Sequence, residues 1–311
     1  AAFAPNFTVL LLMRFAQGLG AAGTRVISQS IVRDRFGGRA MAEVMSMVFM
    51  VFMAVPIIAP GIGQIVLLTG PWEYIFYFMG LLGIMIGAWA VFRLPETLVP
   101  EKRRALRLGV IVEGFRLVLT NRLALGYGLA GMVLFGALFG FINTAQQIYV
   151  DIYGLGALFP VAFAGMAGLM AVASYLNSRV VRRIGMRRLS HTALIIFTSV
   201  AGIWFLVTLA GTPPFWLFFI LLGTVMFMFS WAASNMNALS MEPLGAVAGT
   251  ASSVFGFIQT VGGAILGTIT GQVFDGTQTP VASGYFLLGL AAILAVVFAE
   301  RGKLFGVGED A

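Results

Sequence analysis

The segment VLLLMRFAQGLGAAGTRVISQSI, Val9 to Ile31, decides the fold class because it is long and apolar enough to cross a membrane. It also carries a charge, which needs an explanation. A membrane-spanning helix needs about 20 predominantly apolar residues. Arg14 lies a few residues inside the segment, and a charge in lipid costs from about 3 to more than 10 kcal/mol. We therefore interpret Arg14 as a functional residue that faces a bundle interior or a water-filled cavity. The structural alternative is that its aliphatic stem reaches the nearer interface.

Two neighbours of Arg14 support the functional interpretation. Gln17 follows one turn later on the same helix face, where the two side chains can interact. Gly18, together with Gly20 to Gly23, makes a strip poor in side chains, and such a strip lets another helix approach closely. We predict that Arg14, Gln17 and Gly18 belong to the functional site.

The composition places the chain among polytopic α-helical membrane proteins. It is 59% hydrophobic and 10% charged, which is far outside the range of soluble globular proteins. The net charge of +7 comes from short basic clusters between apolar runs, a pattern that favours positive loops over nucleic-acid binding. The absence of cysteine excludes thiol chemistry, and the single histidine, His191, leaves no histidine cluster to hold a metal.

Hydropathy predicts nine membrane spans. They lie near residues 8–32, 43–68, 73–93, 123–148, 157–180, 191–210, 214–238, 246–273 and 281–300. Apart from Arg14 and Arg25, the lysines and arginines fall in every second connection, and by the positive-inside rule those connections are cytoplasmic. The chain is thus predicted to begin outside and to end in the cytoplasm.

The longest hydrophilic segment divides the predicted spans into three and six. We predict that residues 1–98 are the remainder of an N-terminal helical half, that 99–121 form a cytoplasmic linker with an amphipathic helix on the membrane surface, and that 122–311 form a C-terminal six-helix half. An ordinary soluble linker helix is the alternative. With three further helices before residue 1 the division would become six plus six, which is the plan of a large class of transporters.

The second predicted span contains VPIIAPGIGQ, Val55 to Gln64. Pro56 and Pro60 would bend this helix, and Gly61 and Gly63 would let a neighbouring helix close against the bend. The alternative is plain packing, since glycine and proline are commoner in membrane helices than in soluble ones.

These motifs, in their order along the chain, resemble the drug:proton antiporters of the major facilitator superfamily, and more narrowly its bicyclomycin-resistance (Bcr/CflA) family. RFAQGLGAAGTRVISQSIVRDRF is similar to the family's fourth-helix motif, and VPIIAPGIGQ to its fifth-helix antiporter motif, with Ala59 and Gln64 in place of glycines. PWEYIF and RLPETL resemble the start and end of its sixth helix, except that Glu73 replaces a base. LNSRVVRRIGMRRL resembles its basic loop after helix eight, and PLGAVAGTASSVFGFIQTVGGAILG its eleventh helix.

The resemblance implies an all-α polytopic membrane protein with the major facilitator superfamily fold, incomplete, holding helices four to twelve of twelve. It implies a monomer in the bacterial inner membrane that exports small hydrophobic or cationic drugs by alternating access, driven by the proton gradient without any other cofactor. Arg14, Gln17 and Gly18 would then serve transport or coupling. In the resembled family the proton-carrying acid belongs to the first helix, so we expect residues 1–311 alone not to couple efflux to protons. Glu73 is the first acid to suspect if they do.

Polar or aromatic residues that interrupt the apolar spans are candidates for the substrate cavity, because lipid would leave their polar atoms unsatisfied. They are Asn143, Gln146, Gln147, Tyr149, Trp231, Asn235, Phe255 and Gln259. For each, interhelical hydrogen bonding is an open alternative. We expect Gly249, Ser253, Gly256, Thr260, Gly263 and Gly267 to form a helix-packing stripe, with Phe255 and Gln259 facing elsewhere.

Two rival functions stay open. A same-fold transporter of a sugar, amino acid or siderophore would need several fixed polar partners, and the spans rich in methionine and phenylalanine offer few. A membrane enzyme or a non-transporting scaffold is disfavoured as well, since the acidic residues fall in predicted loops or at span ends and suggest no catalytic or metal site. The identity of the substrates stays open.

Overall fold

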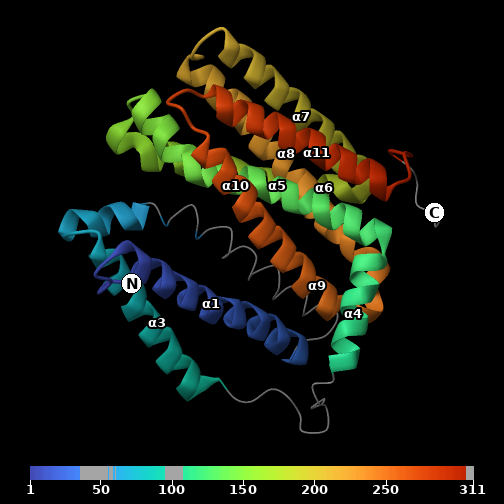
Figure 1. The fold of residues 1–311 in the computed structure, drawn as a ribbon, viewed down its shortest axis with the longest axis horizontal. Coiled ribbons are helices and arrows are strands. Elements are labelled where there is room, and N and C mark those ends of the chain that lie inside the picture. The colour runs from blue at the N-terminus through green and yellow to red at the C-terminus, as the bar shows by residue number, and fades with distance from the viewer. Residues whose placement is uncertain (36–54, 56–58, 60, 95–107, 306–311) are drawn as a thin grey trace. The chain divides into compact units, whose positions relative to one another are not determined.

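The computed structural model describes residues 1–35, 55, 59, 61–94 and 108–305. The chain divides into two compact units, Ala1–Leu106 and Arg107–Ala311. Within the described residues the regular structure is helical (Figure 1). We refer to the two parts as unit 1 and unit 2.

Unit 1 contains two long described helices, α1 (Phe7–Arg35) and α3 (Glu73–Arg93). The first turn of α1 is capped by Asn6, whose side-chain oxygen accepts the N–H of Val9 at 2.9 Å. α3 ends at Leu94, which has an extended backbone and precedes a proline in the sequence, a position that disfavours helix. Residues 61–69 are also helical. Most of the predicted second span, 43–68, lies outside the described residues.

Unit 2 begins with α4 (Leu108–Thr120) and continues through a bundle of long helices. In chain order the bundle consists of α5 (Arg122–Gln146) with its π-helical extension η2 (Gln147–Ile152), η3 (Gly156–Leu158), α6 (Phe159–Ile184), α7 (Met186–Leu209), α8 (Phe215–Met241), η4 (Glu242–Val247), α9 (Ala248–Phe257), η5 (Ile258–Gly262), α10 (Gly263–Gln272) and α11 (Thr279–Ala299). α5 packs against α8, α10 and α11, while α7 packs against α8 and α11.

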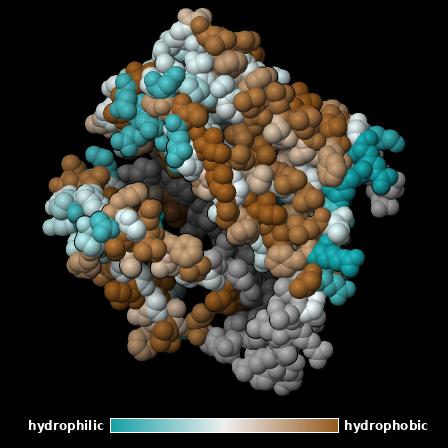
Figure 2. Space-filling model, in the orientation of Figure 1, coloured by the Kyte–Doolittle hydropathy of each residue, from teal (hydrophilic) through white to brown (hydrophobic). Residues whose placement is uncertain are grey.

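The core of unit 2 is built from large side chains at these helix contacts. Tyr127, Phe197, Trp204, Phe218 and Tyr285 are fully buried. Other large apolar side chains, such as those of Ile203, Leu206, Trp216, Leu287 and Leu294, point outward and are exposed. Figure 2 shows the same pattern, with hydrophobic residues over much of the visible face of unit 2. An apolar exterior around a packed core is the arrangement that a bilayer requires.

Seven described helices are long and apolar enough to cross a membrane. They coincide with seven of the nine predicted spans, so the prediction of a polytopic α-helical membrane protein is confirmed. The start of α7 corrects the sequence analysis, which placed it at residue 191. α6 ends at Ile184 and α7 begins at Met186, because Gly185 adopts φ 85° and turns the chain with no further loop. Arg187 therefore lies in the first turn of α7.

The predicted amphipathic helix is present as α4, and one face of it is buried in unit 2. Val118 is fully buried, and Gly114 faces Thr250 of α9, where a Cβ would lie 3.0 Å from the threonine methyl group. Val112, Phe115 and Leu119 are exposed on the remaining surface. These contacts show that α4 packs on the bundle through Gly114 and Val118.

Candidate functional site

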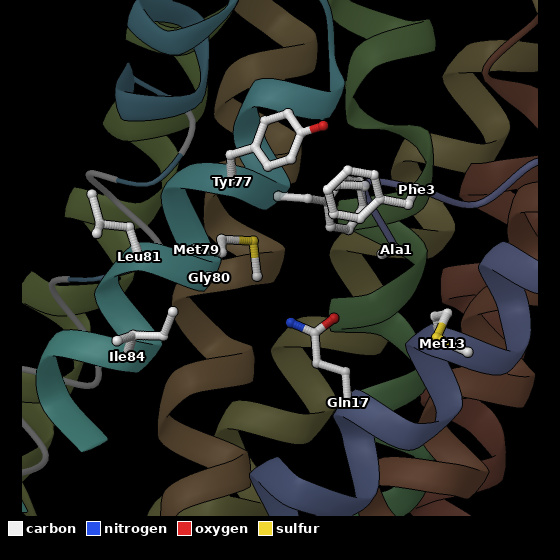
Figure 3. A pocket seen from close by; sticks show the side chains of 11 residues that line it. Ala1, Phe3, Met13, Gln17, Tyr77, Met79, Gly80, Leu81 and Ile84 are labelled. Carbon is white, nitrogen blue, oxygen red and sulfur yellow. The ribbon is translucent and has the colours of Figure 1, made fainter. Parts of the chain in front are cut away.

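An open groove in unit 1 lies between the first residues of the chain, α1 and α3, with a volume of about 560 Å³ (Figure 3). Its lining is mainly aromatic, aliphatic and thioether in character, and its polar groups include the Gln17 amide and the Tyr77 hydroxyl. The lining residues are Ala1, Ala2, Phe3, Met13, Gln17, Phe76, Tyr77, Met79, Gly80, Leu81 and Ile84. Such walls suit an apolar ligand, and methionines adapt readily to different shapes.

Arg14 lies beside this groove and holds Gln17 in place. Its Nη1 donates to Gln17 Oε1 at 2.7 Å, and its guanidinium lies 5.7 Å from the centroid of the Phe76 ring on α3. The predicted proximity of Arg14 and Gln17 is therefore confirmed. A cation over an aromatic face is stabilised by about 0.5 to 2 kcal/mol, depending on desolvation. At Gly18 an added Cβ would meet no atom within 4 Å in the described structure.

Glu73 opens α3 on the same helix face as the groove residues Phe76, Tyr77 and Gly80. Its Oε2 atom is buried and has no hydrogen-bond partner. A buried carboxylate oxygen is costly when no donor faces it, and none of the described residues donates to this atom. Glu73 was the first acid to suspect in proton coupling, and the burial of its oxygen without a described partner is visible only in the structure.

The residues predicted to form the antiporter hinge are only partly described. Pro56 and Pro60 lie outside the described residues. Gly61 and Gly63 are half-buried in the helical segment 61–69. A Cβ at either would meet no atom of the described residues of unit 1 within 4 Å, so no described helix packs closely on them.

The candidates at the end of α5 separate into exposed and buried groups. Asn143 and Gln146 are exposed, whereas Tyr149 is fully buried. The Tyr149 hydroxyl and Gln147 Oε1 are buried without a hydrogen-bond partner. Both belong to η2, a π-helical turn, and such turns recur at functional sites. The Tyr149 ring lies among the rings of Phe159, Phe215 and Phe218.

A polar cluster that sequence reasoning missed secures the same end of unit 2. Tyr153 donates its hydroxyl to Pro213 O at 2.8 Å and accepts from Gln278 Nε2 at 2.6 Å. Gln278 Oε1 accepts from Trp204 Nε1 at 3.1 Å. Burial raises the pKa of Tyr153 above its ordinary value, so this hydroxyl stays protonated and keeps its role as a donor.

Trp231 and Asn235 of α8 both bond to α6. Trp231 Nε1 donates to Ala173 O at 2.7 Å, and Asn235 Nδ2 donates to Asn177 Oδ1 at 2.8 Å. Asn177 is a buried partner that the sequence analysis did not single out. Trp231 and Asn235 therefore form interhelical hydrogen bonds, which was the alternative left open for both residues. Their role at the substrate cavity stays a prediction.

The expected orientation of Phe255 and Gln259 is wrong. Both side chains are buried, and they face glycines of α5: a Cβ at Gly131 would lie 2.8 Å from Gln259 Nε2, and one at Gly128 would meet the Phe255 ring. Gly263 and Gly267 lie at a helix contact, as predicted, and their partner is α5. Thr260 is exposed, and a Cβ at Gly256 would meet none of the described atoms within 4 Å. The π-helical turn η5, between α9 and α10, shifts the helix phase, so one straight stripe cannot connect these positions.

A second missed cluster connects α5, α7, η4 and the end of α11. Glu300 Oε1 accepts from the Tyr127 hydroxyl at 2.6 Å and from Arg187 Nε at 3.0 Å. Arg187 Nη2 also pairs with Glu242 Oε2 at 3.2 Å, and Tyr127 Oη lies 2.9 Å from His191 Nε2. A signal was present in the sequence, namely a carboxylate at the end of an apolar span and a histidine near the start of another.

Comparisons with known proteins identify the family. The sequence matches the Major Facilitator Superfamily over residues 1–267. It is 33% identical over 293 residues to a bicyclomycin resistance protein homolog of Haemophilus influenzae, covering 94% of this chain and 72% of that protein. It is 28% identical over 299 residues to the uncharacterized MFS-type transporter YdgK of Bacillus subtilis, covering 94% and 73%. With the multidrug resistance protein MdtL of Escherichia fergusonii it shares 26% identity over 315 residues, covering 99% and 76%.

These relatives confirm the resemblance stated from the motifs, and the apolar helices confirm a multi-pass membrane protein. The chain belongs to the Major Facilitator Superfamily, a family of transporters rather than of enzymes.

Proposed function

We propose that this protein exports small hydrophobic or cationic drugs across the bacterial inner membrane, with the inward flow of protons as the driving force. The observation that carries the proposal is Arg14, held by Gln17 and Phe76 beside an apolar groove. The names of its relatives, a bicyclomycin resistance protein homolog and a multidrug resistance protein, support drugs as the substrate class.

The groove explains how such substrates would be bound. Phe3, Phe76 and Tyr77 offer ring faces, and Met13 and Met79 offer flexible thioethers, so the groove can adapt to apolar molecules of different shape. The shortage of fixed polar groups disfavours a sugar or amino acid, because such ligands would lose hydrogen bonds to water without replacement. Export would follow by alternating access between two halves of the protein.

The orientation and assembly follow the sequence analysis. Basic connections place the C-terminus in the cytoplasm by the positive-inside rule. We propose that the protein acts as a monomer in the bilayer, uses the proton gradient without any other cofactor and binds no nucleic acid.

Drug susceptibility of a host that lacks its own exporters tests this function. Cells that express the full-length gene should grow at higher concentrations of several apolar or cationic drugs than cells that express the same gene with Arg14→Ala at the same membrane level. In everted vesicles, the same drugs should cause proton release that a protonophore abolishes. Equal susceptibility of the two strains across the panel, together with altered uptake of a sugar or amino acid, would indicate a metabolite transporter instead.

A further inference from the structure

The last described residues form a turn that folds back onto unit 2. α11 ends at Ala299, and the N–H of Gly302 donates to Val297 O at 3.0 Å. This ending places Arg301 in the left-handed region with φ 53°, where glycine is usual. Phe305 is left-handed as well, with φ 64°. Non-glycine residues in this region persist when surrounding contacts hold them there. We call residues Glu300 to Phe305 the C-terminal turn.

His191 of α7 is the contact that holds the end of this turn. The backbone N–H of Phe305 donates to His191 Nδ1 at 3.1 Å. The Phe305 ring meets the imidazole edge to face, with centroids 5.5 Å apart. His191 is 2% exposed, and Leu304 packs against the core of unit 2. The end of the turn, Leu304 and Phe305, is therefore docked by one polar bond and two apolar contacts.

The hydrogen-bond pattern fixes where the protons lie. A backbone amide can only donate, so His191 Nδ1 must be the unprotonated nitrogen of a neutral ring. The proton is then on Nε2, which lies 2.9 Å from the Tyr127 hydroxyl oxygen and donates to it. Tyr127 in turn donates to Glu300 Oε1 at 2.6 Å. Each donor in this chain has an acceptor, and His191 is neutral.

We propose that the C-terminal turn is a pH-controlled latch, closed while His191 is neutral and opened when Nδ1 takes a proton from solution. A protonated imidazole donates from both nitrogens, so Nδ1–H and the Phe305 N–H would face each other without an acceptor. Imidazole is the side chain whose charge ordinarily changes between about pH 5 and 8. In the proposed orientation this end faces the cytoplasm, and the latch would respond to cytoplasmic pH.

Protonation of His191 breaks the hydrogen bond from the Phe305 N–H, and the charged and titratable groups near the imidazole do not replace it. They are Tyr127 from α5, Arg187 from α7 itself, Glu242 from η4, and Glu300, Arg301 and Lys303 from the C-terminal turn. Glu300 favours the imidazolium, but it already accepts from Arg187 and Tyr127. Protonated Nε2 still donates to Tyr127. The bond from Phe305 to Nδ1 alone loses its acceptor.

The mobility of a spin label on the turn reports whether the latch is open or closed. The chain contains no cysteine, so one introduced cysteine carries the label specifically. Lys303→Cys in the full chain, labelled in liposomes, should be immobilised at about pH 8 and should lose the immobilised component at about pH 5, across the range in which imidazole titrates. In His191→Gln, the amide can accept from Phe305 and donate to Tyr127 but does not ionise. This variant should therefore stay immobilised at both pH values.

Two comparisons decide the outcome. A label on Thr212, in the exposed link between α7 and α8, should not change with pH; an equal change there would indicate global loosening and overturn the latch. A pH response that persists in His191→Gln would overturn it too, as would a wild-type turn that is insensitive to pH. If the glutamine variant is mobile throughout, Phe305→Gly decides with His191 intact, because glycine keeps the N–H and adopts φ 64° without strain. A turn immobilised at about pH 8 and mobile at about pH 5 supports the latch, and a turn insensitive to pH refutes it.

Discussion

At the scale of single residues, Arg14 is expected to be essential for transport. It donates to Gln17 and covers the Phe76 ring beside the groove. Arg14→Ala removes the charge together with both contacts, so it should abolish drug efflux from loaded cells while the protein level in the membrane stays normal.

The conservative substitution Arg14→Lys distinguishes the effect of the positive charge from the effect of the planar guanidinium group. Arg14→Lys keeps the charge but lacks the planar fork that can donate to Gln17 while it covers a ring, so it should also be impaired. Arg183→Ala, at an exposed arginine of unit 2, serves as the control and should transport normally. Wild-type efflux by Arg14→Ala at normal membrane level would contradict the role assigned to Arg14.

Two glutamates should respond in opposite ways to loss of charge. Glu300 accepts from Tyr127 and Arg187, so Glu300→Gln should destabilise the protein by about 2 kcal/mol. Glu73 Oε2 is buried without a donor among the described residues, so Glu73→Gln breaks no hydrogen bond at this atom and should be neutral or stabilising. Thermal unfolding of both variants in detergent measures the contrast. A larger loss for Glu73→Gln would show that Glu73 has a partner in the folded protein.

At the scale of helices, close packing of α10 on α5 depends on Gly267. A Cβ there would lie 2.8 Å from the backbone N of Gly140, which leaves no room for a side chain. Gly267→Ala should cost about 1 to 3 kcal/mol, the usual range for overpacking. Gly256→Ala, in α9, meets no atom within 4 Å and should be neutral or slightly stabilising. Unfolding midpoints in detergent compare the pair, and equal losses would place both glycines at the same kind of contact.

The packing face of α9 and α10 could not be predicted from spacing alone. The sequence showed small residues at steps of three and four, and these steps assume an uninterrupted α-helix. The π-helical turn at Ile258–Gly262 inserts an extra residue, which brings Gln259 onto the contact with α5 and leaves none of the described atoms within 4 Å of a Cβ at Gly256. No local pattern in the sequence marks such a turn, because its stabilisation comes from the neighbouring helix.

At the scale of the whole molecule, the link between α7 and α8 and the C-terminal turn after α11 should lie on opposite sides of the membrane. The link at Thr212 should be outside and Lys303 inside, by the positive-inside rule. Single cysteines at these two positions, probed with a membrane-impermeant thiol reagent in intact cells, should react only at Thr212. Both should react after the cells are opened. Labelling of Lys303→Cys in intact cells would invert the proposed topology.

The sequence by itself determined the class of the protein, its family and most of its spans. Hydropathy is a local property, since about 20 apolar residues must cross the bilayer whatever lies beside them. The pairing of Arg14 with Gln17 was likewise predictable, because residues three apart on a helix are neighbours. The apparent loop before residue 191 was misread because arginines suggested a loop, and only the positive φ of Gly185 shows that the helices follow each other directly.

Only the tertiary structure decided which apolar faces meet each other and which polar groups are joined. In a membrane protein both the core and the lipid are apolar, so periodicity does not distinguish a buried face from an exposed one. The Tyr127–Glu300 bond connects residues 173 positions apart, and the docking of Phe305 on His191 spans 114. Such pairs form because the helices carrying them pack side by side, a consequence of the whole fold rather than of any one segment.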